Sequence, residues 1–443
     1  MNRRPRAAGN LWQHSNSERL ESRRLEGDLS VDLAIVGGGF TGCAAALSAA
    51  GAGASVALFE ARSVAHGGSG RNVGLVNAGL WLPPDAVIAQ MGDGPGRRLV
   101  EALGAGPATV FDLIARHGID CQARQAGTLH LAHAPAGLRD LEVRHRQGLR
   151  HGAPLQLLDR AEATRRTGSS AFHGALLDPR AGTLQPRAYC TGLARAAAAQ
   201  GAIIHEDSPV EALTRESGTW CLQVAGHRVR ASRLLLATNA YHRDLEGGIA
   251  PRFVPISYSQ FATAPLSEAQ LRHVLPGGEG CWDTATVMSS IRLDAAGRLI
   301  VGGMGDSEGP GGAIHLGWAR RKLRQLFPAL EALPFDYQWQ GRIAMTGDHL
   351  PKVVEVGPGA YACFGYSGRG ICPGTLIGTA AARALLEDRP DILPLPVIAA
   401  HAERVPGLRA RFYEFGATLV HALGPRALPR RRRSGGPRRH RTH

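Results

Sequence analysis

A run of glycines near residue 40 constrains the fold of this chain more than any other feature. Gly37 and Gly39 follow residues 31–36, a continuous apolar segment typical of a buried parallel strand. Gly42 lies in the first turn of the small-residue helix predicted over residues 41–50, and residues 55–59 predict a second strand. This order of strand, glycine turn, helix and strand predicts one βαβ unit.

The spacing of these glycines is typical of a dinucleotide site, although a purely structural glycine turn is the alternative. We expect Gly37 to permit the tight turn, Gly39 to let the backbone approach a pyrophosphate, and Gly42 to let the helix pack closely on the strand. The helix N-terminus would add amide donors and a positive dipole. Glu60 ends the second strand, where a carboxylate suits ribose hydroxyls and disfavours a 2′-phosphate.

A second glycine-rich segment, GGSGRNVG at residues 67–74, favours FAD over NAD. It follows the ribose acid directly, so it can run along the pyrophosphate toward a flavin ring. Ser69 and Arg71 would offer a hydroxyl and a guanidinium to this anionic ligand. A flexible surface loop is the alternative for this segment, and an NAD-linked dehydrogenase is the alternative for the whole βαβ unit.

The later segments predict a discontinuous nucleotide domain. Helices are predicted over residues 188–200, 316–326 and 374–386, and strands over residues 202–205, 234–237 and 360–364. Residues 220–224 and 227–230 predict a hairpin about Gly226, and residues 253–303 predict an antiparallel sheet. The predicted fold class is α/β and α+β, a Rossmann-like FAD-binding domain with an interleaved antiparallel-sheet substrate domain. We expect a polar leader at 1–29, an FAD-binding domain at 30–80, 151–245 and 340–400, a substrate domain at 81–150 and 246–339, a C-terminal helix at 401–424 and a disordered Arg-rich tail at 425–443.

Charge and cysteine usage exclude several classes of protein. Much of the net charge of +14 lies in the tail, which cannot bury apolar surface, so we do not expect nucleic acid as the partner. Seven cysteines with no CxxC pair favour reduced thiols in the cytoplasm and no metal site. No signal peptide is expected, and glycines interrupt the apolar residues 31–59, so we expect no membrane span.

Several motifs in one order carry a resemblance to a known family. They are GGGFTG from Gly37, FEA ending at Ala61, GGSGRNVG from Gly67, ATNAY from Ala237, GRIAMTGDHLP from Gly341 and GYSGRG from Gly365. Over residues 11–417 the chain resembles the D-amino-acid-oxidase-like superfamily of FAD-dependent oxidoreductases, especially the bacterial branch of gamma-glutamylputrescine oxidoreductases. The resemblance implies that a small amine or amino acid loses a hydride to flavin, giving an imine that hydrolyses.

The resemblance also implies the positions of the cofactor contacts. Together with the two glycine turns, it assigns FAD binding to Gly37, Gly39, Phe40, Thr41, Gly42, Glu60, Ala61, Ser69, Arg71, Asn72, Val73, Gly74, Val210, Thr238, Asn239, Gly368, Arg369 and Gly370. Two departures from related sarcosine oxidases matter. Gly341 and Arg342 stand near the position of their flavin-linking cysteine, so we expect non-covalent FAD. In those oxidases a lysine beside the ring helps oxygen react, and residues 298–303 hold no lysine. The electron acceptor is therefore left open between O2 and another compound.

The substrate side is less constrained. The catalytic candidates are Arg292, Tyr258, Tyr366 and Arg369, although the chemistry is driven by flavin and needs no base. Arg292 would hold a substrate carboxylate, Arg369 would approach the pyrimidine end of the flavin ring, and Tyr258, Trp339 and Tyr366 would form an aromatic wall around an amine. A flavin-dependent RNA-modifying enzyme that uses the basic tail, and a binding subunit that keeps FAD structurally, remain alternatives.

Overall fold

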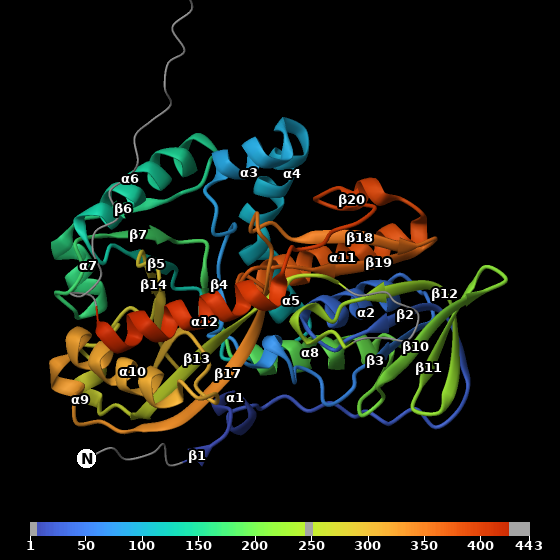
Figure 1. The fold of residues 1–443 in the computed structure, drawn as a ribbon, viewed down its shortest axis with the longest axis horizontal. Coiled ribbons are helices and arrows are strands. Elements are labelled where there is room, and N and C mark those ends of the chain that lie inside the picture. Colours follow the sequence, from blue (N-terminus) through green and yellow to red (C-terminus); the bar gives the residue numbers. More distant parts are fainter. Residues whose placement is uncertain (1–6, 244–250, 425–443) are drawn as a thin grey trace, which may run out of the picture.

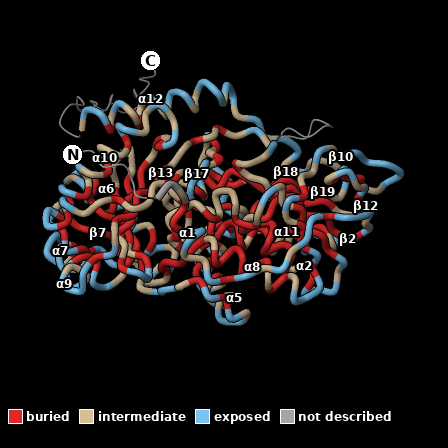
Figure 2. Tube along the Cα trace, turned by 90° about the horizontal axis from the view of Figure 1, so that it is seen from below, coloured by how far each residue is buried: buried red, intermediate tan, exposed pale blue. Residues whose placement is uncertain are grey.

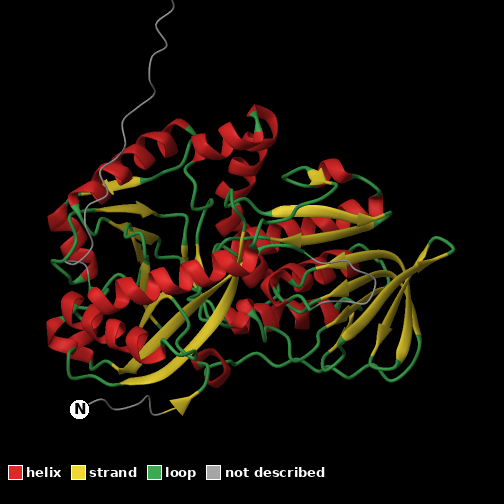
Figure 3. Ribbon diagram, viewed as in Figure 1, coloured by secondary structure: helices red, strands yellow, loops and turns green. Residues whose placement is uncertain are grey.

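Two large sheets lie side by side in the computed structural model, which describes residues 7–243 and 251–424 (Figures 1 and 3). The tail predicted at 425–443 lies outside the described residues. The parallel sheet runs in the order β20 (Val397–Ile398), β18 (Lys352–Gly357), β19 (Ala360–Phe364), β12 (His227–Leu236), β2 (Leu29–Val36), β3 (Val56–Phe59) and β9 (Ile203–His205), with β11 (Thr219–Val224) on β12 and β10 (Val210–Glu216) on β11. Its centre, from β19 to β9, is parallel throughout.

The second sheet is mainly antiparallel. It runs in the order β1 (Ala7–Ala8), β17 (Phe335–Met345), β13 (Val254–Pro265), β16 (Arg298–Met304), β15 (Ser289–Leu293), β14 (Gly280–Asp283), β5 (Thr128–Leu131), β7 (Ala175–Asp178) and β6 (Gln156–Leu158). A small sheet pairs β4 (Leu75–Val76) with β8 (Gly182–Thr183). The predicted fold class is therefore confirmed.

Three small-residue helices pack together beside the parallel sheet and form its main core. They are α2 (Phe40–Gly51), α8 (Pro186–Ala199) and α11 (Ile371–Glu387). The packing of α11 on α2 depends on glycine, because a Cβ added at Gly378 would lie 2.2 Å from the carbonyl oxygen of Thr41. This close contact positions the N-terminus of α2 for the site described below.

The remaining helices surround the antiparallel sheet or connect the two sheets. They are α1 (Leu11–His14), α3 (Pro84–Met91), α4 (Asp93–Gly104), α5 (Gly106–Arg116), α6 (Pro135–Arg150), α7 (Arg160–Thr167), α9 (Glu268–Leu271), α10 (Gly312–Leu326) and α12 (Pro406–Leu423). Helix α12 lies across β13 (Figure 1) and has exposed residues along its length (Figure 2). Among the helices of residues 7–243 and 251–424, none is both long enough and apolar enough to cross a bilayer.

The sequence predicted two separate strands where the structure has one, β12. The second arm of the predicted hairpin and the buried strand predicted at 234–237 are both parts of β12. Burial alternates over its first half, where β11 pairs with it, and becomes continuous over Leu234–Leu236, where β2 and β19 flank it. The change in periodicity along one strand therefore produced two separate predictions.

The segment expected to be a polar leader is partly buried and belongs to the folded body. The Trp12 side chain is fully buried, and its ring packs edge-on against Trp339 at 5.9 Å between centroids. Residues 151–245 were expected in the FAD-binding domain, but β6 and β7, which lie within this range, pair in the antiparallel sheet. We propose to group residues 156–178 with the substrate side rather than with the FAD-binding side.

Candidate active site

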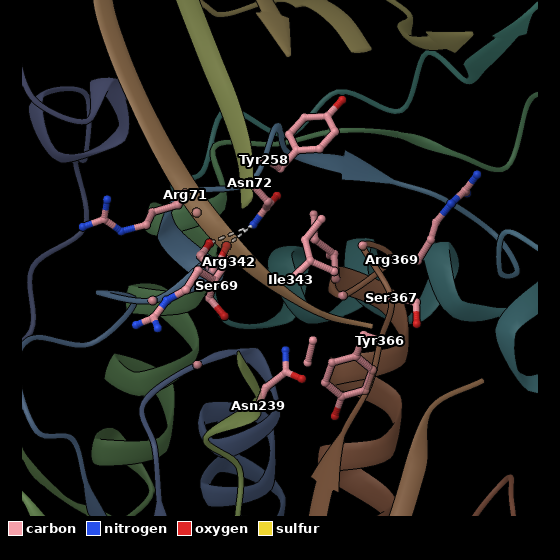
Figure 4. Close-up of a pocket in the computed structure, with 18 of the residues that line it drawn as sticks. Ser69, Arg71, Asn72, Asn239, Tyr258, Arg342, Ile343, Tyr366, Ser367 and Arg369 are labelled. Carbon is pink, nitrogen blue, oxygen red and sulfur yellow. Dashed lines mark hydrogen bonds between the residues drawn. The ribbon is translucent and has the colours of Figure 1, made fainter. Parts of the chain in front are cut away.

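A cavity of about 540 Å³ lies between the two sheets, within the range of roughly 300–1,000 Å³ that is usual for cofactor and ligand sites (Figure 4). The parallel sheet contributes the turn after β2 and the end of β3. The antiparallel sheet contributes Tyr258, Trp282 and Ser290. The loop before α11, with Tyr366 and Arg369, completes the wall between them.

At one end of the cavity, glycines let the turn after β2 come very close to its neighbours. Gly37 has φ +109°, and a Cβ added there would lie 2.9 Å from the carbonyl oxygen of Ala237. A Cβ at Gly42 would lie 2.0 Å from the carbonyl oxygen of Gly37. Helix α2 begins directly after this turn and points its N-terminus at the cavity, where the dipole and free amides favour an anion.

Two polar side chains sit beside this helix N-terminus. The Ser69 hydroxyl accepts a hydrogen bond from the Phe40 N–H at 3.0 Å. The Glu60 carboxylate accepts the N–H groups of Gly38 at 2.8 Å and Arg62 at 3.0 Å. Burial raises the pKa of Glu60, and the backbone hydrogen bonds oppose this shift. The Glu60 carboxyl group therefore lines the cavity at the end of β3 and is fixed there by two backbone N–H groups.

The loop of residues 67–74 is folded by its own side chains. The Asn72 amide donates to the carbonyl oxygens of Gly68 and Ser69, both at 3.0 Å, and its oxygen accepts the Gly74 N–H at 2.8 Å. Arg71 donates to two carbonyl oxygens, those of residues 66 and 340. In Figure 4 the Arg71 side chain extends away from the middle of the cavity. These two side chains hold the shape of the loop.

Indole and amide groups from distant segments clamp the same loop. Asn10 donates from Nδ2 to the Gly70 carbonyl at 2.5 Å, and Trp12 donates from Nε1 to the Asn72 carbonyl at 2.8 Å. Trp339 donates from Nε1 to the Arg71 carbonyl at 2.9 Å. The N-terminal segment thus positions the loop, a role that its polar composition did not indicate.

At the other end of the cavity, Arg369 is held between two tryptophans. Its Cζ atom lies 4.4 Å from the ring centroid of Trp81 and 4.4 Å from that of Trp282. Its Nε atom is buried and has no hydrogen-bond partner within the described part of the chain. Burial lowers the pKa of Arg369 to about 9, so the group stays charged near neutral pH. The arrangement leaves a buried cation that lines the cavity.

The ring next to this cation is a neutral histidine, and the neighbouring arginine is already paired. The His130 ring stacks on Trp282 with centroids 5.0 Å apart, and burial keeps its pKa well below the usual value. Arg144 also lines the cavity, but it donates to the Asp140 carboxylate at 2.8 Å and to the Trp81 carbonyl at 2.9 Å. Arg369 is therefore the arginine here that is available to an anion.

Two of the tyrosines that line the cavity, Tyr258 and Tyr366, are neutral hydrogen-bonding groups. The Tyr366 hydroxyl lies 2.7 Å from the Thr41 hydroxyl, and it joins the loop before α11 to the start of α2. The Tyr258 hydroxyl donates to the Ser290 hydroxyl at 3.1 Å. Burial raises the pKa of both phenols, so neither ionises near neutral pH.

The structure brings most of the predicted site residues to this one cavity. Those that line it are Gly37, Gly39, Phe40, Thr41, Glu60, Ala61, Ser69, Arg71, Asn72, Val73, Val210, Thr238, Asn239, Tyr258, Tyr366, Gly368, Arg369 and Gly370. Gly42 and Gly74 lie behind it and shape the backbone. Several lining residues were missed, namely Trp81, His130, Arg144, Trp282 and Ile343. Trp81, His130, Arg144 and Trp282 come from separate segments without a motif, so no local signal singled them out. Ile343 belongs to the GRIAMTGDHLP motif, which was used only for the family resemblance.

Arg292 and Trp339 lie outside the cavity lining, contrary to the roles expected of them. The Arg292 guanidinium is buried and donates to the carbonyl oxygens of Val73, Gly74, Leu184 and Leu293. Burial lowers its pKa to about 10. Its donors thus brace the backbone beside the loop of residues 67–74, and a substrate carboxylate would have to displace these bonds.

Similarity to known proteins identifies the family of this chain. The family model of DAO-type FAD-dependent oxidoreductases matches residues 32–384. The chain belongs to this family. This FAD-dependent oxidoreductase is 31% identical over 363 residues to the probable oxidoreductase OrdL of Haemophilus influenzae, covering 81% of this chain and 83% of the relative. It is 30% identical over 368 residues to gamma-glutamylputrescine oxidoreductase of Escherichia coli, covering 82% and 85%.

A solved structure shares the fold of this flavoenzyme. Glycine oxidase of Geobacillus kaustophilus matches it with a TM-score of 0.67 at 22% identity, over 82% of this chain and 95% of the other. Membership of an FAD-dependent family overturns the NAD-linked alternative. At one end of the cavity, the glycine turn after β2 and the α2 N-terminus fit a pyrophosphate, and the carboxyl group of Glu60 fits a ribose.

Proposed function

We propose that this flavoenzyme oxidises a small amine that carries a carboxylate, and that Arg369 holds that carboxylate. The observation that carries this proposal is the Arg369 guanidinium, which lines the cavity between Trp81 and Trp282 and whose buried Nε is unpaired within the described part of the chain. A buried cation without an anion is costly, and a bound carboxylate would relieve this cost through charge-assisted hydrogen bonds. The names of the relatives, gamma-glutamylputrescine oxidoreductase and glycine oxidase, support an amine or amino-acid substrate.

The residues around the cavity would perform three tasks. FAD, when bound, supplies the two-electron oxidant for the substrate C–H bond. Trp81, Trp282 and Tyr258 would exclude water and orient the amine end of the substrate, while Arg369 fixes its acidic end. Neutral His130 adds no competing charge. The product imine would then hydrolyse to a carbonyl compound and an amine or ammonia.

Further features of the cavity support a non-covalent FAD. Cys372 is the one cysteine in the lining among the described residues, and burial raises the pKa of its thiol, so it is not a thiolate near neutral pH. Gly341 stands near the position of the flavin-linking cysteine of sarcosine oxidases, and a Cβ added there would lie 3.0 Å from the Arg71 Cβ. We propose that the pigment is released when the protein is precipitated with acid.

The cavity lining contains no lysine among the described residues, which bears on the identity of the electron acceptor. Lys322 binds Asp283 at 2.8 Å and Lys352 binds Asp348, and neither lysine lines the cavity. We propose that an acceptor other than O2 reoxidises the flavin in the cytoplasm. Reoxidation of the reduced protein should be faster with an artificial acceptor dye than with air.

The test of the proposed function is an anaerobic screen. Pairs of compounds that differ only by a carboxylate, an amino acid and its matching amine, would be added to the yellow protein without oxygen. We expect the carboxylate member of at least one pair to bleach the flavin faster. If every pair reacted equally, or only the amines did, the role of Arg369 would be refuted.

A further inference from the structure

An unusual share of exposed apolar side chains lies on one helix, α12. Large apolar side chains are exposed on it at five positions, Leu408, Phe412, Phe415, Leu419 and Leu423. The two phenylalanines are 71% and 67% exposed. Single exposed apolar residues are ordinary, but a row of them on one helix marks a surface that something covers.

These five residues, which we call the α12 stripe, lie on one face of the helix. Counted from Leu408 they stand at i, i+4, i+7, i+11 and i+15, the spacing of one helical face. The opposite face is anchored to the protein: Ala417 and His421 are buried, and His421 lies 2.8 Å from His315 of α10 between ring nitrogens. The stripe is therefore held outward by a fixed helix, as Figure 2 shows for the exposed side of α12.

The charges around the stripe are predominantly positive. Glu414, the acidic residue of α12, turns inward to His315 at 3.1 Å and to the Asp306 N–H at 3.0 Å. Arg404 and Arg411 are exposed beside the stripe. The sequence that follows the helix, residues 425–443, contains no acidic residue and eight arginines: Arg426, Arg430, Arg431, Arg432, Arg433, Arg438, Arg439 and Arg441.

We propose that the α12 stripe docks on the surface of an anionic lipid bilayer. Apolar side chains on one face of a helix, beside dense positive charge, are the two features that bind a helix flat in the lipid headgroup region. A second copy of this chain is a poorer occupant, because each copy carries a net charge of +14 and the two would repel each other. The helix would lie on the bilayer and not cross it.

The test uses the full-length, FAD-loaded protein and sedimentation with vesicles. One set of vesicles contains equimolar phosphatidylcholine and phosphatidylglycerol, and the other contains phosphatidylcholine alone. The test variant is Phe412→Glu with Phe415→Glu. Its matched control is Val143→Glu with Leu149→Glu, which places the same two charges at exposed apolar positions of α6. Bound-flavin absorbance and gel-filtration volume report folding and oligomeric state.

We expect the wild type and the control to bind anionic vesicles about tenfold or more tightly than neutral ones. The Phe412/Phe415 variant should lose this binding while keeping its flavin. A third variant with Arg430–Arg433 changed to Gln should bind at least about tenfold more weakly, since each arginine near an anionic surface adds about fivefold.

Three results would overturn the proposal. The first is equal vesicle binding by the two glutamate variants. The second is a wild-type dimer that becomes a monomer when Phe412 and Phe415 are changed, because a second copy would then cover the stripe. The third is a four-arginine variant that keeps its vesicle binding and loses binding to transfer RNA, which would assign the positive charge to nucleic acid.

Discussion

Replacing Arg369 with methionine should lower activity and raise stability together. Methionine is flexible and fills the space between Trp81 and Trp282 without a charge. If Arg369 holds a carboxylate, removing one partner of a buried charge pair costs about 2–5 kcal/mol. The kcat/KM for the carboxylate substrate should then fall by about 30-fold to several thousandfold, while that for the matching amine without a carboxylate should change little.

The stability effect has the opposite sign because the guanidinium is buried without an anion. Its pKa falls from 12.5 to about 9, and at roughly 1.4 kcal/mol per pKa unit the charged form costs on the order of 4–5 kcal/mol. Loss of two cation–π contacts, each worth roughly 0.5–2 kcal/mol, offsets part of this gain. We expect a net rise of about 1–3 kcal/mol in the free energy of unfolding of the FAD-loaded protein, measured by denaturant titration without substrate.

Arg144 supplies the matched control for this prediction. It lines the same cavity, but its guanidinium is already bonded to Asp140 and to the Trp81 carbonyl. Arg144→Met should therefore lower stability by roughly 1 kcal/mol and leave the preference for a carboxylate largely intact. The reasoning would be refuted if Arg369→Met discriminated between the paired substrates as the wild type does, or if it destabilised the protein more than Arg144→Met.

Three further changes test other parts of the structure. Gly42→Ala should destabilise the protein by about 1–3 kcal/mol or more and lower its flavin content, because the new Cβ would lie 2.0 Å from the Gly37 carbonyl oxygen; a normal flavin-to-protein absorbance ratio would contradict this. Ser69→Ala should weaken FAD binding about fivefold, since the hydroxyl at the Phe40 N–H faces the expected pyrophosphate; titration of flavin-stripped protein measures it, and unchanged affinity would count against this position for the pyrophosphate. Burial lowers the pKa of His421 to about 3, so the unfolded chain takes up its proton near pH 6.5 while the folded protein does not. Stability should fall by roughly 1 kcal/mol per pH unit as the pH drops from 6.5 toward 3 because of this group, and His421→Gln should show a shallower slope in denaturant titrations across that range.

The nucleotide end of this flavoenzyme could be predicted from the sequence because its signals are local. The turn at Gly37–Gly42 couples a buried strand, a helix start and close backbone contacts within a few residues, and the loop at residues 67–74 follows directly after the next strand. The same short segments specify both the backbone path and the place where a pyrophosphate can approach. The family, the fold class and most of the cavity lining at this end follow from them.

The substrate end depended on packing that no local pattern carries. Arg292 and Arg369 are both buried arginines, and the sequence favoured Arg292 as the carboxylate anchor. In the folded chain Arg292 meets four backbone carbonyl oxygens, whereas Arg369 meets two indole rings, contributed by Trp81 and Trp282 from separate segments. Whether a guanidinium is already bonded or open to a ligand depends on which distant groups surround it, and only the tertiary structure brings those groups together.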